Sequence, residues 1–95
     1  MGIVVDDSLY IFGGYDGTQR TNDFYRFDFD TCTWTQIITN NLPPSPRDRH
    51  VAVVYDRFIY IFGGFDGVNR VNDFNCYNIN TNMWKEVPNK GNDLK

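Results

Sequence analysis

The feature that most constrains the fold of this chain is that nearly the same sequence occurs twice without a gap. Residues 10–24 read YIFGGYDGTQRTNDF, and residues 60–74 read YIFGGFDGVNRVNDF. Trp34 recurs as Trp84, so the offset is 50 residues there as well. Repetition at a period of roughly 20 to 50 residues is typical of solenoids and propellers, in which each repeat is one structural unit. The chain is therefore expected to contain two copies of one unit.

Each copy contains short segments that favour β-strands. HVAVVY (50–55) is rich in β-branched residues, and FIYIF (58–62) is a continuous apolar run, as expected for a strand covered on both faces. FYRFDF (24–29) alternates apolar and polar residues, and TWTQII (33–38) and MWKEV (83–87) form the last strand of each copy. Helical spacing over ten or more residues does not occur. The pattern predicts an all-β fold with two four-stranded antiparallel sheets.

Composition argues against several classes of partner and site. With a formal net charge of −3, the chain has no basic field that would attract nucleic acid, and no apolar run approaches the ~20 residues of a membrane span. Cys32 lies in a predicted turn and Cys76 on a predicted strand, so both are expected to be free thiols. Free thiols and the lack of an Asn-x-Ser/Thr acceptor site favour a reducing, cytoplasmic location.

Several marks at fixed spacing carry a resemblance to a known family. They are the glycine pairs Gly13-Gly14 and Gly63-Gly64, the downstream aromatic residues Phe27 and Tyr77, the tryptophans Trp34 and Trp84, and the lead-in PPSPRDRH. With these marks the sequence resembles the kelch repeat family over essentially its whole length, and most of all intracellular multi-kelch adaptor proteins. The resemblance implies two four-stranded antiparallel blades of a kelch-type β-propeller.

Two blades make an incomplete ring, because propellers close with roughly four to eight blades. We expect blade 1 over residues 1–39, with its first strand truncated at the start, an inter-blade linker over 40–49, blade 2 over 50–88 and a C-terminal tail over 89–95. The open sheet faces predict contact with other kelch blades, in cis or by self-association. A two-blade piece of a longer kelch protein is favoured, and closure by several copies stays open.

The resemblance places the loop after each glycine pair, residues 15–21 and 65–71, on one face of the propeller. The shared Asp, Gly and Arg are expected to hold the loop, with Arg20 paired to Asp16 or Asp23 and Arg70 paired to Asp66 or Asp73. The positions that differ between copies are expected to carry any partner preference. Arg20 and Arg70 are interpreted first as structural, with the grip of a carboxylate or phosphate as the alternative. The lead-in arginines, at positions 47 and 49, are expected to lie open. The partner-binding candidates are Tyr15, Thr18, Gln19, Arg20, Phe65, Val68, Asn69, Arg70, Arg47 and Arg49.

Other marked residues are expected to build the scaffold. The glycines suit a strand that ends and bends into a loop, and the Asp-Gly pairs suit turns. The tryptophans are expected to pack between adjacent blades. The resemblance makes the single histidine a structural hydrogen-bonding residue at the start of a strand. The structural set is Gly13, Gly14, Gly63, Gly64, Asp16, Asp66, Trp34, Trp84 and His50.

The sequence contains no catalytic or metal-binding constellation. It has no G-x-S-x-G elbow, no Cys–His pair close in sequence and only one histidine, so no cofactor or metal is expected. The leading hypothesis is a non-enzymatic protein–protein interaction module that presents loops to a protein partner of unknown identity. Two alternatives stay open: part of a propeller enzyme whose catalytic residues lie outside this chain, and a purely structural propeller segment.

Overall fold

A computed structural model of the chain describes residues 2–88, which form eight β-strands and no helix. The first sheet contains β1 (Gly2–Val5), β2 (Ser8–Tyr15), β3 (Arg20–Asp28) and β4 (Thr33–Gln36), and the second contains β5 (Val51–Tyr55), β6 (Phe58–Phe65), β7 (Arg70–Asn78) and β8 (Met83–Glu86). Neighbouring strands are antiparallel and follow chain order in both sheets. The predicted all-β fold with two kelch-type blades is confirmed. The tail expected at 89–95 lies outside the described residues.

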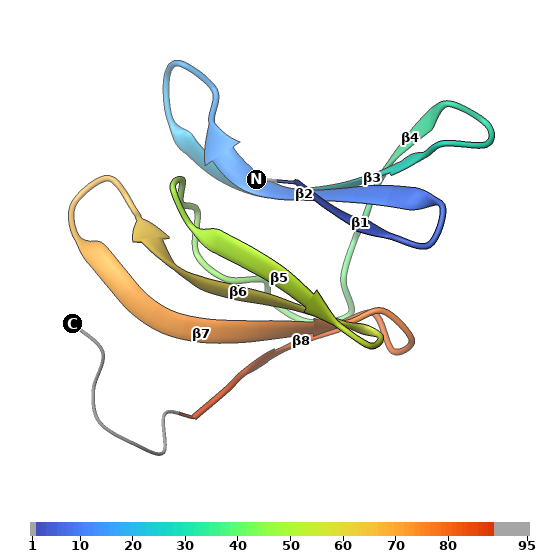
Figure 1. Cartoon of the computed structure of the whole chain (residues 1–95). Helices are drawn as coiled ribbons and strands as arrows, with labels where there is room; N and C mark the ends of the chain where they lie inside the picture. The colour runs from blue at the N-terminus through green and yellow to red at the C-terminus, as the bar shows by residue number, and fades with distance from the viewer. Residues whose placement is uncertain (1, 89–95) are drawn as a thin grey trace.

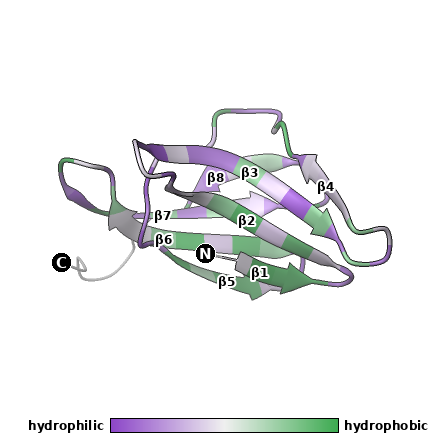
Figure 2. Ribbon diagram, turned by 90° about the horizontal axis from the view of Figure 1, so that it is seen from above, coloured by the Kyte–Doolittle hydropathy of each residue, from purple (hydrophilic) through white to green (hydrophobic). Residues whose placement is uncertain are grey.

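The two blades are stacked as two layers and joined by the segment between β4 and β5 (Figure 1). Their first strands, β1 and β5, lie side by side, with hydrophobic residues along both (Figure 2). No described strand crosses the expected boundaries between residues 39 and 40 or between 49 and 50. Each blade is thus a separate sheet, and the main hydrophobic core has to form between blades.

The core lies where the inner face of the first blade meets the second blade. Ile61 is fully buried there, and Trp84 is only 5% exposed. The Trp84 ring packs against Phe12, Phe24 and Tyr77, with ring centroids 5.2–5.4 Å away. The side chains that meet between the blades are Val5, Tyr10, Phe12, Phe24, Ile59, Ile61, Tyr77 and Trp84.

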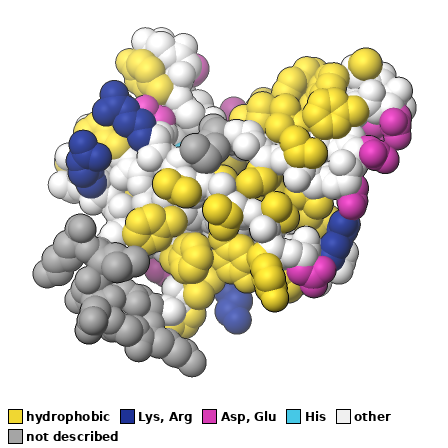
Figure 3. Space-filling model, viewed as in Figure 1, with side chains coloured by type: hydrophobic (Ala, Val, Ile, Leu, Met, Phe, Trp, Pro, Cys, Tyr) yellow, Lys and Arg dark blue, Asp and Glu magenta, His cyan; other side chains and the backbone are white. Residues whose placement is uncertain are grey.

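Each blade has a second face that no described residue covers. Leu9 pairs with Phe27, and Phe27 pairs with Trp34, so these side chains share the outer face of the first blade. The Trp34 side chain is 54% exposed and stacks on Phe27 of its own sheet, on a face that no blade within residues 2–88 covers, so its packing between adjacent blades stays a prediction. Hydrophobic side chains also spread over much of the surface in Figure 3. The exposed ones on β5 are Val51, Val53, Val54 and Tyr55.

The strand that precedes each loop is longer than predicted. Gly63 and Gly64 do not end β6, which bulges between Phe62 and Gly64 and then continues to Phe65. β2 has the same bulge and continues to Tyr15. A bulge admits the glycines by an extra bend while the strand pairing resumes beyond it. The loops are therefore only residues 16–19 and 66–69, shorter than the predicted 15–21 and 65–71.

Candidate functional site

Three irregular segments gather at one edge of the molecule. The β2–β3 loop (16–19) and the β6–β7 loop (66–69) project on the same side in Figure 1. Residues 44–50, which we call the inter-blade segment, run between them before β5 begins. We call these three segments, together with the strand ends that flank the two loops, the loop edge. It contains all ten residues that the sequence nominated for partner binding.

Backbone hydrogen bonds fasten the inter-blade segment to both blades. Arg47 donates its N–H to the carbonyl of Thr21 at 3.1 Å, and its own carbonyl accepts from Gly14 at 2.8 Å. On the other side, Asp48 and Phe65 exchange two hydrogen bonds of 2.8 and 3.0 Å. The segment therefore positions the two loops relative to one another.

The glycine pairs make room for this segment. Gly13 and Gly64 both have positive φ, at 66° and 111°. A Cβ at Gly13 would lie 2.8 Å from the carbonyl oxygen of Arg47, and one at Gly64 would lie 2.8 Å from that of Asp48. Glycine is required here by both conformation and space.

Arg47 is buried, so its expected open position is wrong. The residue is 1% exposed, and all five of its side-chain hydrogen bonds go to protein. Nη1 and Nη2 donate to the Asp73 carboxylate at 2.5 and 2.9 Å. Nη1 also donates to the carbonyl of Gly63, Nη2 to the hydroxyl of Ser45 and Nε to the carbonyl of Ser45. A loop arginine with this geometry fixes the inter-blade segment to the second blade and is unavailable to a partner.

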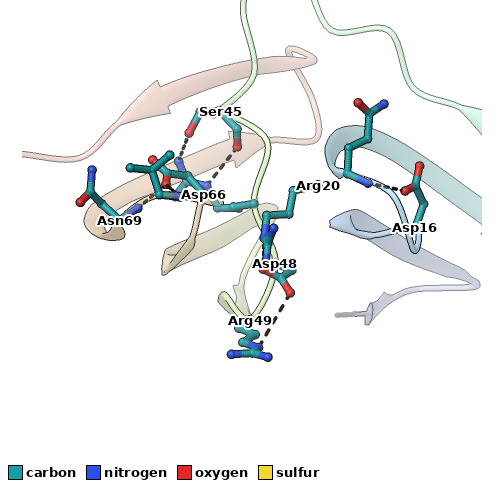
Figure 4. A network of polar contacts seen from close by, with 10 residues as sticks. Asp16, Arg20, Ser45, Asp48, Arg49, Asp66 and Asn69 are labelled. Carbon is teal, nitrogen blue, oxygen red and sulfur yellow. Dashed lines mark hydrogen bonds and ion pairs between the residues drawn. The ribbon is translucent and has the colours of Figure 1, made fainter.

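Arg20 connects the two blades through an ion pair and cation–π contacts. Its Nε donates to Asp48 at 2.9 Å, so the expected pairing with Asp16 or Asp23 is wrong. Its guanidinium also lies over the rings of Tyr15 and Phe65, 4.9 and 4.7 Å from the centroids. Figure 4 shows Arg20, Asp48 and Arg49 in one chain of contacts. Cation–π contact and the ion pair together give Arg20 a structural position.

The two Asp-Gly turns have the same internal geometry. The Asp16 carboxylate accepts N–H bonds from Thr18 and Gln19 at 2.9 and 2.8 Å, and Asp66 accepts the equivalent pair at 2.9 and 2.7 Å. These backbone donors lower the pKa of both carboxyl groups. The turns therefore hold an ionised aspartate in each loop at neutral pH.

The remaining candidates lie on the outer surface of the loop edge. Arg49 has a 72% exposed side chain and Val68 is 80% exposed. Basic side chains collect near the loops in Figure 3. The exposed nominated residues are Tyr15, Thr18, Gln19, Arg49, Val68, Asn69 and Arg70.

Asp48 and Asp73 are the two acids that hold the loop edge together. The sequence named Asp73 only as a partner of the loop arginine Arg70, not of Arg47, and it did not single out Asp48. Repetition could have indicated a structural role for Asp73, because this residue falls in the NDF stretch that occurs in both copies. Asp48 lies in the lead-in, which the described part of the chain contains only once, so repetition gave no sign of its role.

His50 lies under the inter-blade segment and is 2% exposed. Its ring packs edge-on against Phe12, with centroids 5.6 Å apart. Neither ring nitrogen finds a well-formed hydrogen bond within residues 2–88, although the nearby backbone of Phe12 favours the protonated form slightly. Burial, with a smaller contribution from the charge of Arg47, lowers the pKa of His50 to about 4.

The low pKa of His50 predicts a pH-dependent stability. The unfolded histidine takes up a proton near pH 6.5, but the folded one only near pH 4, so acidification through that window favours the unfolded chain. Urea unfolding at pH 7 and pH 4 should give free energies of unfolding that differ by up to about 3 kcal/mol from this group. The variant His50→Leu should lose that part of the pH dependence, and an unchanged slope would contradict the prediction.

Other sites of chemistry are not evident in the described residues. No cluster of three or more potential metal ligands occurs among residues 2–88. Cys32 is exposed and Cys76 is buried, and both are free thiols. In the same range, no helix is long and apolar enough to span a bilayer.

Comparison with known proteins gives one family. A family model described as the KLHDC2/KLHL20/DRC7 Kelch-repeats domain matches residues 1–95. Leucine-zipper-like transcriptional regulator 1 of Homo sapiens is 40% identical over 45 residues, which are 47% of this chain and 5% of that protein. The Rab9 effector protein with kelch motifs of Bos taurus is 46% identical over 52 residues, 52% of this chain and 14% of that protein. Kelch domain-containing protein 10 of Rattus norvegicus is 40% identical over 50 residues, 50% of this chain and 12% of that protein. The chain therefore spans only a small part of each relative's length.

Proposed function

Because the chain belongs to the kelch-repeat family, we propose that it is a non-enzymatic protein-interaction module whose loop edge binds a protein partner. A relative named as a Rab9 effector supports a role in protein contacts. A part in an adaptor or scaffold belongs to the same proposal. The two free thiols fit a reducing compartment, so we place this function in the cytoplasm.

One observation carries the proposal. At the loop edge, three side chains at positions that both copies share are engaged inside the molecule: Asp16 and Asp66 form turns, and Arg20 joins the two blades, whereas Arg70 is exposed. Two of the positions that differ between the copies, 18 with 68 and 19 with 69, are exposed in both. A rigid scaffold with a variable exposed surface is a usual design for recognition.

The proposal predicts that four exposed loop residues control binding. A variant with Thr18→Ala, Gln19→Ala, Val68→Ala and Asn69→Ala should weaken binding to a partner captured by the unmodified chain by about tenfold or more. A few contact residues carry most of the binding energy of an interface, and a combined loss of about 1.4 kcal/mol from the four truncations is enough for a tenfold change. Within residues 2–88 only the backbone N–H groups of these four residues, and not their side chains, bond to Asp16 and Asp66, so folding should survive. Binding is measured by titration of the captured protein, and folding by circular dichroism.

A matched control changes four exposed residues at the opposite ends of the blades. Asp30→Ala, Thr31→Ala, Asn80→Ala and Thr81→Ala alter the β3–β4 and β7–β8 turns by a similar amount. This variant should bind normally. Equal binding by both variants would refute the loop-edge proposal and favour a purely structural segment.

A further inference from the structure

A cavity of about 310 Å³ lies between the two blades, beside the β7–β8 turn and away from the loop edge. Tyr10 and Arg26 line it from the first blade, and Tyr77, Ile79 and Asn82 line it from the second. Because both walls belong to described residues, the cavity does not depend on any further blade. Its volume is at the small end of sites that hold small molecules.

Arg26 brings an unpaired positive charge to this cavity. It lies opposite Tyr10 on β2 and Thr35 on β4, so its side chain is on the face that meets the second blade. Its Nε is buried and has no hydrogen-bond acceptor, and no carboxylate in residues 2–88 forms an ion pair with it. A desolvated guanidinium N–H without an acceptor is unfavourable until an anion supplies one.

The repeat itself does not explain this arginine. Arg26 falls at the position of Cys76 in the second copy, and Cys76 is buried without a charge. The blade therefore forms with a small neutral side chain at the same place. A charge here is a departure specific to the first blade.

The cavity is partly open, and its walls combine isoleucine side chains with polar groups that are already fixed. Tyr77 donates its hydroxyl to the Asn82 side-chain oxygen at 2.7 Å, and the Asn82 amide donates to the carbonyl of Ile38 at 2.9 Å. These bonds tie the chain after β4 to the second blade. The side chains of Ile38 and Ile79 add hydrocarbon surface, and no acidic residue lines the space. A preformed site that combines one cation with isoleucine side chains suits an anion carried on an apolar body.

We propose that this cavity binds a small organic carboxylate, with the carboxylate on Arg26 and its apolar body against Ile38 and Ile79. A carboxylate matches the planar guanidinium, which can bind it through two parallel hydrogen bonds. A free phosphate is disfavoured, because it carries more charge than a carboxylate and Arg26 is the single cation that lines the cavity. The carboxylate comes either from a free acid or from an acidic side chain of another protein.

Titration by nuclear magnetic resonance tests the site, with phenylacetate as the probe and the arginine Nε–H signals as the readout. We expect a saturable shift of the Arg26 signal with a dissociation constant of roughly 1 mM. The neutral analogue phenylacetamide should bind at least tenfold more weakly. Equal binding of the amide, or a shift that never saturates, would overturn the proposal.

Two variants show whether the arginine is responsible. Arg26→Met should fold, since it removes a desolvated charge, and should bind phenylacetate at least tenfold more weakly. Arg57→Met, which removes a surface arginine paired with Asp6, should bind it normally. Unchanged binding in Arg26→Met would refute the site. N-acetyl-glutamate N-methylamide, which mimics a glutamate within a protein, tests where the bound carboxylate comes from. Tighter binding than phenylacetate identifies an acidic side chain of another protein as the ligand, and weaker binding identifies a free acid.

Discussion

Replacing Arg47 with methionine is expected to lower the free energy of unfolding by about 3 kcal/mol. The substitution leaves the carbonyl of Gly63 without its donor and the Asp73 carboxylate without its partner. Breaking a buried ion pair from one side costs roughly 3–5 kcal/mol, and the 30% exposure of the Asp73 side chain places this case at the lower end. Urea unfolding at pH 7 measures the loss.

Arg57→Met is the matched control for this prediction. Arg57 also forms an ion pair between the blades, with Asp6, but the two side chains are 39% and 73% exposed. Exposed pairs contribute about 0–1 kcal/mol, so the control should change stability little. A loss in Arg47→Met no larger than in Arg57→Met would show that the inter-blade segment does not depend on its buried arginine.

The buried pair Arg47–Asp73 also predicts how stability responds to acid. Burial raises the pKa of Asp73, but hydrogen bonds from Arg47 and Asn75 and the charge of Arg47 outweigh it, and the pKa lies below its usual value. The stabilisation from a carboxyl with a lowered pKa is present above about pH 4 and is lost as the pH falls further. It therefore falls in a lower pH range than the loss expected from His50, and the two effects are separable.

The fold was predictable from the sequence because the 50-residue repeat defines the structural unit. A 50-residue offset with four strand-like segments per copy leaves few architectures, and the marks at fixed spacing led to the family. The glycine pairs were misinterpreted as strand ends because glycine serves both turns and bulges. Only the pairing of Tyr15 with Arg20 beyond the glycines decides between them.

The position of the loop edge was predictable from the sequence, but the contacts of its residues were not. The sequence located the loops correctly, yet it put Arg47 on the surface, because a charged lead-in with prolines has the composition of an exposed loop. Its burial follows from the tertiary path of residues 44–50 between two blades, which no local pattern encodes. The unusual arginine at position 26 was visible as a mismatch with Cys76, but its meaning required the cavity.

Trp84→Ala is expected to cost about 3–5 kcal/mol, while Trp34→Ala, at the equivalent place in the first blade, should cost about 1 kcal/mol or less. Trp84 is 5% exposed and packs on aromatic rings of both blades. Trp34 is 54% exposed and its ring packs against Phe27 of its own sheet. Urea unfolding of both variants, at low protein concentration, gives the comparison.

The difference between the two tryptophans measures whether the outer face of the first blade is covered in solution. The face around Trp34 is the repeat equivalent of the face around Trp84, which the first blade covers. If another copy packed there, Trp34→Ala would cost nearly as much as Trp84→Ala, and stability would rise with protein concentration by mass action. A small, concentration-independent effect of Trp34→Ala means that the face is open in this chain. A large one means that the chain associates head to tail through the same contacts that join its own blades.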